Sequence, residues 1–248
     1  MKYRSECGLA MQIMRYTCPE IYNAGRDCTR HMAEANKSHF EAMTRVLGYI
    51  AGTPKRGLLL KPFGTWNGTR EYKFKVNGRA DSDYAKNPDD RKSVSGCRTL
   101  LNGAPVIWRS STQPTVSLSV TESEQRAGVQ CAQDMLYVMR WLEALELQVE
   151  KPMVLEMDNK GAIDLANNWS TGGRTRHVEV GQYFLRELKE QGLIVIKWIK
   201  SEDNDADLFT KNLAGPEFNK HVKAFCGDDE YQNAANLSVG ENTERRRV

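Results

Sequence analysis

The stretch YKFKVNGRADSDYAKNPDDRKSVSG, residues 72 to 96, joins a strand pattern to a run of acidic residues. Tyr72, Phe74 and Val76 alternate with lysines, and this period of two predicts a half-buried β-strand. The aspartates that follow are also typical of a solvated turn, because Asp and Asn are common turn residues. Asp81, however, comes at the end of the predicted strand, where metal ligands are frequently placed. The stretch therefore raises the question of which other acids meet Asp81 in the folded chain.

The composition is that of a folded globular protein. The chain has 248 residues, of which 40% are hydrophobic, enough for one large domain or two small ones. No stretch approaches about eighteen consecutive apolar residues, so we expect an intracellular, cytoplasmic protein with no membrane partner and no secretory signal. The six cysteines show no C-x-x-C spacing and are predicted to be reduced thiols. The alternative is a zinc site among Cys7, Cys18, Cys28, His31 and His39.

Positive charge is concentrated at the start of the chain. The formal net charge is +3, whereas residues 1 to 61 hold ten Lys or Arg against five Asp or Glu. A basic face of this kind suits a phosphate backbone. The alternative interpretation is a set of solvated helix faces with no binding role.

Residues 1 to 65 are predicted to form a small helical segment. The stretch SHFEAMTRVLGYIAG, residues 38 to 52, has apolar residues at intervals of three and four, and Gly52 followed by Pro54 ends this helix. The turn-rich stretch FGTWNGTREY follows, which places a domain boundary near residue 65.

Residues 66 to 226 show the mixture of strands and helices of an α/β domain. After the first strand, two apolar runs are joined by Asn102 and Gly103, the dipeptide favoured in a tight hairpin. A long helix is predicted to follow, with Thr121 and Glu124 as its capping box. Three antiparallel strands and a helix therefore open this domain.

The remaining sequence continues the mixed α/β pattern. The apolar run MVLEMD is predicted to be a short strand ending in Asp158, two helices and the strand LIVIKWI follow, and NDADLFTKNL begins like a helix. Residues 227 to 248 lack apolar periodicity and are predicted to be a disordered tail.

Four acids occupy similar places at the ends of these elements: Asp81, Glu124, Asp158 and Asp207. If the first and fourth strands are parallel neighbours, they bring two of these acids together, and packed helices bring the others over them. Such a cluster repels itself unless cations fill it. Carboxylate oxygens suit Mg²⁺ or Mn²⁺, and a two-metal site supports phosphodiester cleavage.

Five blocks of sequence carry a resemblance to a known family. They are ADSDYAKNPDDRKSVSG, VIWRSSTQPTVSLSVTESEQRA, MDNKGAIDLANN, RTRHVEV and NDADLFTKNL. In this order and spacing they resemble the ribonuclease H domain of copia-type LTR retrotransposon Pol polyproteins. The stretches YRSECGLAMQIMRYTCPEIYNAGRDCTRHM and HFEAMTRVLGYIAGTPKRGLLL are similar to the thumb or connection region that follows the polymerase palm, so the resemblance covers about residues 3 to 226.

The resemblance implies a ribonuclease H-like mixed five-stranded sheet with flanking helices, preceded by the small helical segment. It also implies two Mg²⁺ or Mn²⁺ ions per site and cleavage of the RNA strand of RNA/DNA hybrids. The implied partners are the hybrid and the polymerase part of the same polyprotein, inside the cell or in retrotransposon particles. The palm's paired-aspartate motif is absent from this sequence, so we expect no DNA synthesis by this chain.

The family's four catalytic, metal-binding acids match Asp81, Glu124, Asp158 and Asp207 block by block. Glu122 is the alternative to Glu124, because both acids belong to the same acid-x-acid pair. Three neighbouring acids are predicted to be solvated or capping residues: Asp83, Asp203 and Asp205.

Several polar residues are candidates for contact with the nucleic acid. They are Arg91, Lys92, Gln113, Arg174, Arg176 and His177. The loop GGRTRH places two glycines beside three basic side chains, which favours approach to a phosphate. For each residue taken singly, ordinary surface charge is the competing interpretation.

The sequence departs from the family's pattern after the helix acid. Gln125 and Arg126 stand where the family usually has an aromatic and an aliphatic residue. We expect the helix to form and the packing beneath the metal site to loosen. Two other hypotheses remain open. In the first, the chain is a remnant of the polyprotein that holds a duplex or a partner subunit without cutting. In the second, it is another nuclease of the same broad fold, such as an integrase, but this hypothesis does not explain the N-terminal stretch.

Overall fold

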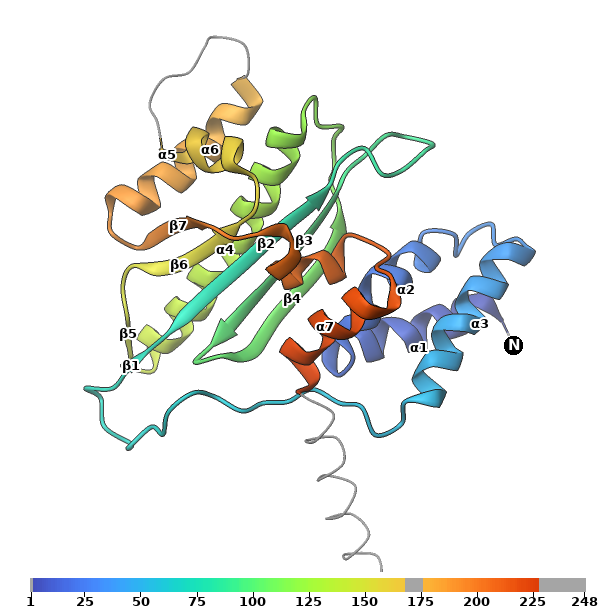
Figure 1. The fold of residues 1–248 in the computed structure, drawn as a ribbon, viewed down its shortest axis with the longest axis horizontal. Helices are drawn as coiled ribbons and strands as arrows, with labels where there is room; N and C mark the ends of the chain where they lie inside the picture. Colours follow the sequence, from blue (N-terminus) through green and yellow to red (C-terminus); the bar gives the residue numbers. More distant parts are fainter. Residues whose placement is uncertain (1, 168–175, 228–248) are drawn as a thin grey trace, which may run out of the picture. The chain divides into compact units, whose positions relative to one another are not determined.

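The computed structural model describes residues 2–167 and 176–227 (Figure 1). The chain divides into two compact units. The first comprises Met1–Leu59 with Asn212–Val248, and the second is Leu60–Lys211. The first break therefore lies close to the boundary predicted near residue 65. The second break is a difference, because the prediction assigned residues up to 226 to the α/β domain.

The helical unit is built on four α-helices among its described residues: α1 (Tyr3–Tyr16), α2 (Tyr22–Thr29), α3 (Lys37–Gly52) and α7 (Gly215–Cys226). The 3₁₀ helix η1 (Pro19–Ile21) precedes α2. Asn36 caps α3 by accepting from the His39 backbone N–H, and the His39 ring accepts from the Asn36 N–H in return. Buried residues of α1, α2 and α3 form the core of this unit, including Cys7, Met14 and Met43.

Helix α7 belongs to the helical unit for a physical reason. Its apolar residues Phe225 and Cys226 are buried, and the Phe225 carbonyl accepts a hydrogen bond of 2.7 Å from the Leu59 N–H. The ring of Phe218 also packs edge-on against that of Tyr49. These contacts join segments far apart in sequence, which is why the linear pattern did not reveal them. The predicted disordered tail lies outside the described residues apart from Gly227.

The second unit contains a mixed five-stranded sheet in the order β4-β3-β2-β6-β7. The strands β2, β3 and β4 are antiparallel, whereas β6 runs parallel to β2, and β7 parallel to β6. Their bounds are β2 (Val76–Asp83), β3 (Val94–Leu101), β4 (Ala104–Thr112), β6 (Met153–Met157) and β7 (Ile194–Trp198). This is the ribonuclease H-like sheet expected from the sequence. A separate two-stranded parallel pair joins β1 (Lys73–Phe74) and β5 (Gln148–Val149).

The long helix α4 (Val120–Ala144) packs on this sheet with α5 (Lys160–Asn167) and α6 (Arg176–Glu190) beside it (Figure 1). Gly78 of β2 permits the close approach, because a Cβ there would lie 2.5 Å from the Cys131 sulfur of α4. The contact fixes the height of the helix along the strand. It thereby sets which residues of the first turns of α4 reach the end of β2.

Local sequence signals explain the hairpin and, with one correction, the start of α4. Asn102 and Gly103 have φ angles of 49° and 84°, as the predicted tight turn requires. The predicted capping box was wrong by two residues. Ser119, rather than Thr121, caps α4 by accepting a hydrogen bond from the Glu122 N–H, which leaves the Glu124 side chain available elsewhere.

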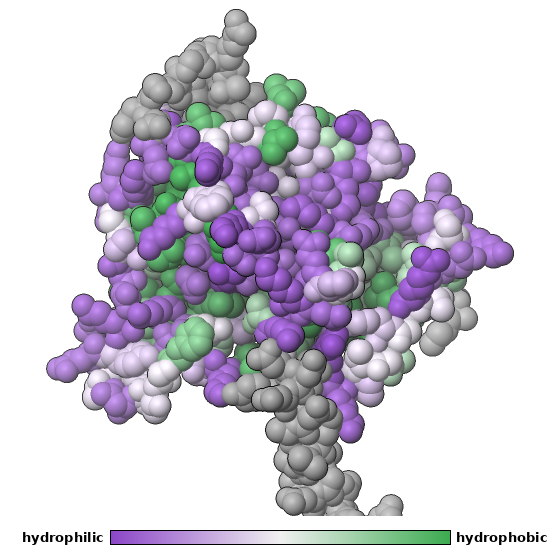
Figure 2. All heavy atoms as spheres, viewed as in Figure 1, coloured by the Kyte–Doolittle hydropathy of each residue, from purple (hydrophilic) through white to green (hydrophobic). Residues whose placement is uncertain are grey.

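After β7 the chain forms two short 3₁₀ helices, η2 (Ser201–Asp203) and η3 (Asp205–Phe209), where the pattern had suggested the beginning of a longer helix. Hydrophilic residues cover most of the face over strands β2 and β3 and this segment (Figure 2). Among the described residues, no helix is both long and apolar enough to span a membrane.

Candidate active site

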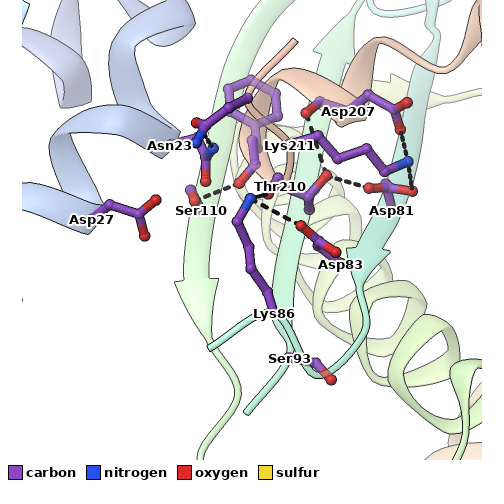
Figure 3. Close-up of polar contacts among 12 residues, drawn as sticks. Asn23, Asp27, Asp81, Asp83, Lys86, Ser93, Ser110, Asp207, Thr210 and Lys211 are labelled. Carbon is purple, nitrogen blue, oxygen red and sulfur yellow. Dashed lines mark hydrogen bonds and ion pairs between the residues drawn. The ribbon is translucent and has the colours of Figure 1, made fainter. Parts of the chain in front are cut away.

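Asp81 lies within β2, two residues before the strand ends at Asp83, and it is only 1% exposed. It pairs across the sheet with Gly96 of β3. A Cβ on Gly96 would lie 2.7 Å from Cγ2 of Thr210, so a glycine is needed for the segment after β7 to pass beside Asp81. The Thr210 hydroxyl then donates a hydrogen bond to Oδ2 of Asp81 (Figure 3).

Glu124 projects from the second turn of α4 toward the end of β2. Its Oε1 accepts a hydrogen bond of 3.2 Å from the Ser82 N–H, and the hydroxyls of Ser82 and Ser123 are 2.8 Å apart. Its Oε2 is buried and has no hydrogen-bond partner among the described residues. Glu122 points elsewhere, since its carboxylate pairs with Arg126 and accepts from the Leu118 N–H. The structure therefore brings Glu124, not Glu122, to Asp81.

Asp158 follows β6 directly, at the end where β2 and β6 run parallel. The Ser201 hydroxyl donates to its Oδ2 at 2.7 Å, and the Trp198 indole N–H donates to its backbone carbonyl at 3.0 Å. The side chain is half-buried. The strand register and these two bonds together orient the carboxylate at the sheet edge.

Asp81, Glu124 and Asp158 form a three-carboxylate group, with one oxygen from each lying within 4.8 Å of the others. Burial raises the pKa of Glu124 to about 9, with further contributions from the charges of Asp81 and Asp158. A buried oxygen without a partner, facing two more carboxylates, is an arrangement that a cation would stabilise. Three hard oxygen donors on three different elements fit a divalent ion such as Mg²⁺ or Mn²⁺.

Asp207 lies beside Asp81 but outside the three-carboxylate group. Lys211 separates them, with its ammonium 3.0 Å from Oδ1 of Asp207 and 3.2 Å from Oδ1 of Asp81 (Figure 3). Burial and the charge of Asp81 raise the pKa of Asp207 to about 8, and Lys211 opposes this shift. Burial lowers the pKa of Lys211, but the two carboxylates outweigh it and raise that pKa overall. No pattern in the sequence singles out Lys211.

Asp205, predicted to be a solvated or capping acid, is instead buried and fully paired. Its two oxygens accept from the Arg98 guanidinium of β3 at 2.9 and 3.1 Å, and Arg79 of β2 approaches at 3.2 Å. Arg79 also bonds Glu156 at 2.7 Å. This network ties η3 to three strands, and it therefore fixes the backbone that carries Asp207 and Lys211. Alternating Asp residues in NDADLF gave no signal that distinguished the two roles.

The predicted nucleic-acid contacts fall in different environments. Arg91 is exposed, and Lys92 is half-buried in the loop before β3 with Asp90 at 3.8 Å. Gln113 is only 4% exposed, and its amide bonds the Ser95 hydroxyl and the Ser123 carbonyl, so it holds the start of α4 in place. Three candidates are not described at the side-chain level: Arg174 lies outside the described residues, and Arg176 and His177 begin α6.

The departures Gln125 and Arg126 are accommodated by α4. The helix is continuous through both positions, as expected. Arg126 turns outward, where its guanidinium bonds Glu122 and Thr115. Gln125 is 2% exposed and lines a cavity of about 370 Å³ together with residues of β4 and α4. Gln125 therefore faces a cavity beside the helix, and the helix that delivers Glu124 stays unbroken.

The sheet order and the three-carboxylate group together define a ribonuclease H-like protein with a candidate metal site. No family model matches the chain. The chain is similar to the retrovirus-related Pol polyproteins of transposon RE1 from Arabidopsis thaliana, at 29% identity over 88% of this chain, and of transposon TNT 1-94 from Nicotiana tabacum, at 32% identity over 87%. Over 87–88% of its length the chain is therefore homologous to retrovirus-related Pol polyproteins of copia-type transposons.

The chain spans 14% of the RE1 polyprotein and 16% of the TNT 1-94 polyprotein. Among solved structures, the N-terminal ribonuclease H domain of a Mycobacterium tuberculosis protein aligns with 61% of this chain and 99% of its own, at a TM-score of 0.41 and 13% identity. The fold assignment rests on the strand order and directions described above.

Proposed function

We propose that this chain is a divalent-metal-dependent endoribonuclease that cuts the RNA strand of RNA/DNA hybrids, as the ribonuclease H part of a retrotransposon reverse transcriptase. The observation that carries the proposal is the meeting of Asp81 of β2, Glu124 of α4 and Asp158, which follows β6, within 4.8 Å. These carboxylates come from distant parts of the sequence, so the fold itself brings them together. Burying like charges together destabilises a fold unless a cation compensates, which makes a chance cluster costly.

Asp81, Glu124 and Asp158 would hold one ion, and Asp81 with Asp207 would hold a second. Mg²⁺ is the proposed ion, and Mn²⁺ suits the same oxygen ligands. Bound ions of this kind supply Lewis acidity and lower the pKa of water, which is the chemistry that phosphodiester hydrolysis needs.

The chain's own residues would orient this site. The Ser82 N–H holds one oxygen of Glu124, and the Ser201 hydroxyl holds one oxygen of Asp158. In each case the remaining carboxylate oxygen is left for a ligand or a water. Burial of Asp81 behind Thr210 keeps bulk water from the rear of the site, so the reacting phosphate would approach from the side of the half-buried Asp158.

The substrate would be recognised chiefly through its phosphates. Arg91 and Lys92 lie in the loop that follows β2, the strand that carries Asp81, and the face over β2 and β3 is mostly hydrophilic (Figure 2). Phosphate contacts position a duplex without reading its sequence. The polymerase part of the polyprotein is the proposed partner, and the inside of the cell or of retrotransposon particles is the proposed place of action.

One observation favours a second candidate, a module that binds a duplex without cutting it. The Asp207 carboxylate is already neutralised by Lys211 at 3.0 Å, so the second ion has a competitor within the chain. If Lys211 never leaves, the site holds at most one ion and cleavage is weak or absent.

The test is cleavage of an end-labelled RNA/DNA hybrid by the purified chain in Mg²⁺, in Mn²⁺ and in chelator. We expect cleavage with either ion and none in chelator. Asp158→Asn should abolish cleavage and leave hybrid binding within about twofold, because the substitution keeps the shape of the side chain while removing a charged ligand. Asp164→Asn, an exposed acid on α5, is the matched control and should cut like the parent.

Two results would contradict the proposal. A folded parent chain that leaves the hybrid intact in both ions supports the binding module instead. A parent that cuts, together with an Asp158→Asn variant that cuts equally fast, would leave the activity standing and remove Asp158 from the site.

A further inference from the structure

Lys211 reaches into the acidic cluster from its open side. Its side chain is 36% exposed, whereas those of the two carboxylates it bridges, Asp81 and Asp207, are 1% and 5% exposed. Its ammonium lies 3.2 Å from one and 3.0 Å from the other (Figure 3). The cluster therefore has two halves that share Asp81. One half is the three-carboxylate group, and the other half contains the chain's own cation.

The two halves differ in how well their oxygens are satisfied. In the three-carboxylate group, Oε2 of the 4% exposed Glu124 is buried with no hydrogen-bond partner among the described residues. In the other half, Asp207 and Asp81 both accept from Lys211, and Asp81 also accepts from Thr210. A divalent ion that enters the cluster thus meets an unpaired carboxylate oxygen at Glu124, whereas beside Asp207 it meets the Lys211 ammonium.

The backbone beneath Lys211 is fixed, while its side chain has an exit to solvent. Thr210 is held on both sides, since its hydroxyl donates to Asp81 and its carbonyl accepts from the Lys86 ammonium. Lys86 is itself paired with Asp83 at 2.9 Å. A lysine side chain on such a support can change rotamer without moving the strand or η3.

We infer that Lys211 is an internal counter-ion that admits one divalent ion to the metal-free chain and blocks the second until a substrate phosphate draws the ammonium away. This inference rests on the proposed function and adds a control over ion occupancy to it. A monovalent ammonium midway between Asp81 and Asp207 fills the space that a second ion needs and repels that ion. A phosphate at the mouth of the site offers the ammonium a new partner, and its departure exposes both carboxylates together.

The test is calorimetric titration of the chelator-treated full chain with MnCl₂ in the absence of nucleic acid. We expect the parent to bind one Mn²⁺ tightly and a second at least about tenfold more weakly, because the ammonium opposes the second charge. Lys211→Met should tighten the second binding step about tenfold or more and leave the first step nearly unchanged. Lys211→Arg keeps the positive charge, so the second binding step should stay weak.

Matched variants separate this role from a structural one. Lys151→Met removes an exposed lysine that pairs with Glu143 at 2.8 Å, and it should leave both Mn²⁺ affinities unchanged. The double variant Lys211→Met with Asp207→Asn should lose the second step again, because the opened place then lacks its own carboxylate. Circular dichroism in the same buffers confirms that each variant is folded.

The outcomes distinguish this inference from the proposed function. Equal Mn²⁺ affinities of the parent and Lys211→Met for the second ion would overturn the role of Lys211 while leaving the nuclease proposal intact. Two tight ions in the parent would overturn it as well. A parent that binds no Mn²⁺ would remove the metal-dependent function and the inference together. A gain of the second ion in a chain that cuts no hybrid would uphold Lys211 and reject the nuclease.

Discussion

Glu124→Gln should stabilise the metal-free protein, and the gain should grow with pH. In the folded, metal-free chain, burial and the charges of Asp81 and Asp158 raise the pKa of Glu124 from 4.5 to about 9. The unfolded chain ionises this group at its ordinary pKa, so between these values the folded state holds a proton that the unfolded state has lost. Stability contributed by the protonated carboxyl is therefore present in full below about pH 4.5 and declines as pH rises toward 9.

The size of the effect follows from the linkage between proton binding and folding. Across that window the parent loses about 1.4 kcal/mol per pH unit relative to a variant that does not titrate. At about pH 7.5 the difference reaches on the order of 3 to 4 kcal/mol, and near pH 4.5 it should vanish. Gln has the same shape as Glu, so the substitution leaves no cavity to offset the gain.

The assay is urea unfolding in chelator at several pH values, with the exposed Glu190→Gln as the matched control. The parent and Glu124→Gln curves should separate as pH rises, and the control should follow the parent. Excess Mn²⁺ should narrow the separation near pH 7.5, because binding to the folded parent adds about 2.7 kcal/mol at a hundredfold excess over the dissociation constant. A stability difference that stays constant from about pH 5 to 9 would refute the reasoning, since it would mean that ionisation of Glu124 costs the fold nothing.

Three further predictions concern the support of the site and its substrate. Gly96→Ala should destabilise the chain by about 1 to 3 kcal/mol and weaken Mn²⁺ binding, because a Cβ there would lie 2.7 Å from Cγ2 of Thr210. Urea unfolding measures the first effect and titration with Mn²⁺ the second. Unchanged values would show that the segment around Thr210 moves aside at no cost. Asp205→Asn should cost about 3 to 5 kcal/mol in the same unfolding assay by leaving buried Arg98 without its charge partner, and a loss below about 1 kcal/mol would contradict this. Lys92→Met should lower hybrid affinity equally for different sequences and reduce the slope of log K against log salt by about 1, measured by fluorescence anisotropy; an effect confined to one sequence would indicate base readout instead.

Local sequence patterns were sufficient for most of the strands and for placing Asp81 and Asp158 near strand ends. Alternation and apolar runs predicted the strands, and Asn102-Gly103 predicted the hairpin because both of its central residues need positive φ. Asp158 follows a short apolar run, so its place at a strand end is a local property. The parallel pairing of β2 with β6, which could be stated from the sequence only as a condition, brings Asp158 to Asp81.

Only the tertiary structure decided how the acids after β7 are used. Asp205 and Asp207 are two residues apart in the same polar sequence, yet one is buried against Arg98 and the other against Lys211. Lys211 meets Asp81 across 130 positions of sequence, and no periodicity encodes such a contact. Whether a carboxylate binds an ion, an arginine or a lysine depends on which charge lies within about 3 Å of it once water is removed, because electrostatic interactions strengthen and desolvation costs rise in the same buried space. The type of each element is determined largely by local sequence, whereas the partner of each buried charge exists only after distant segments have packed.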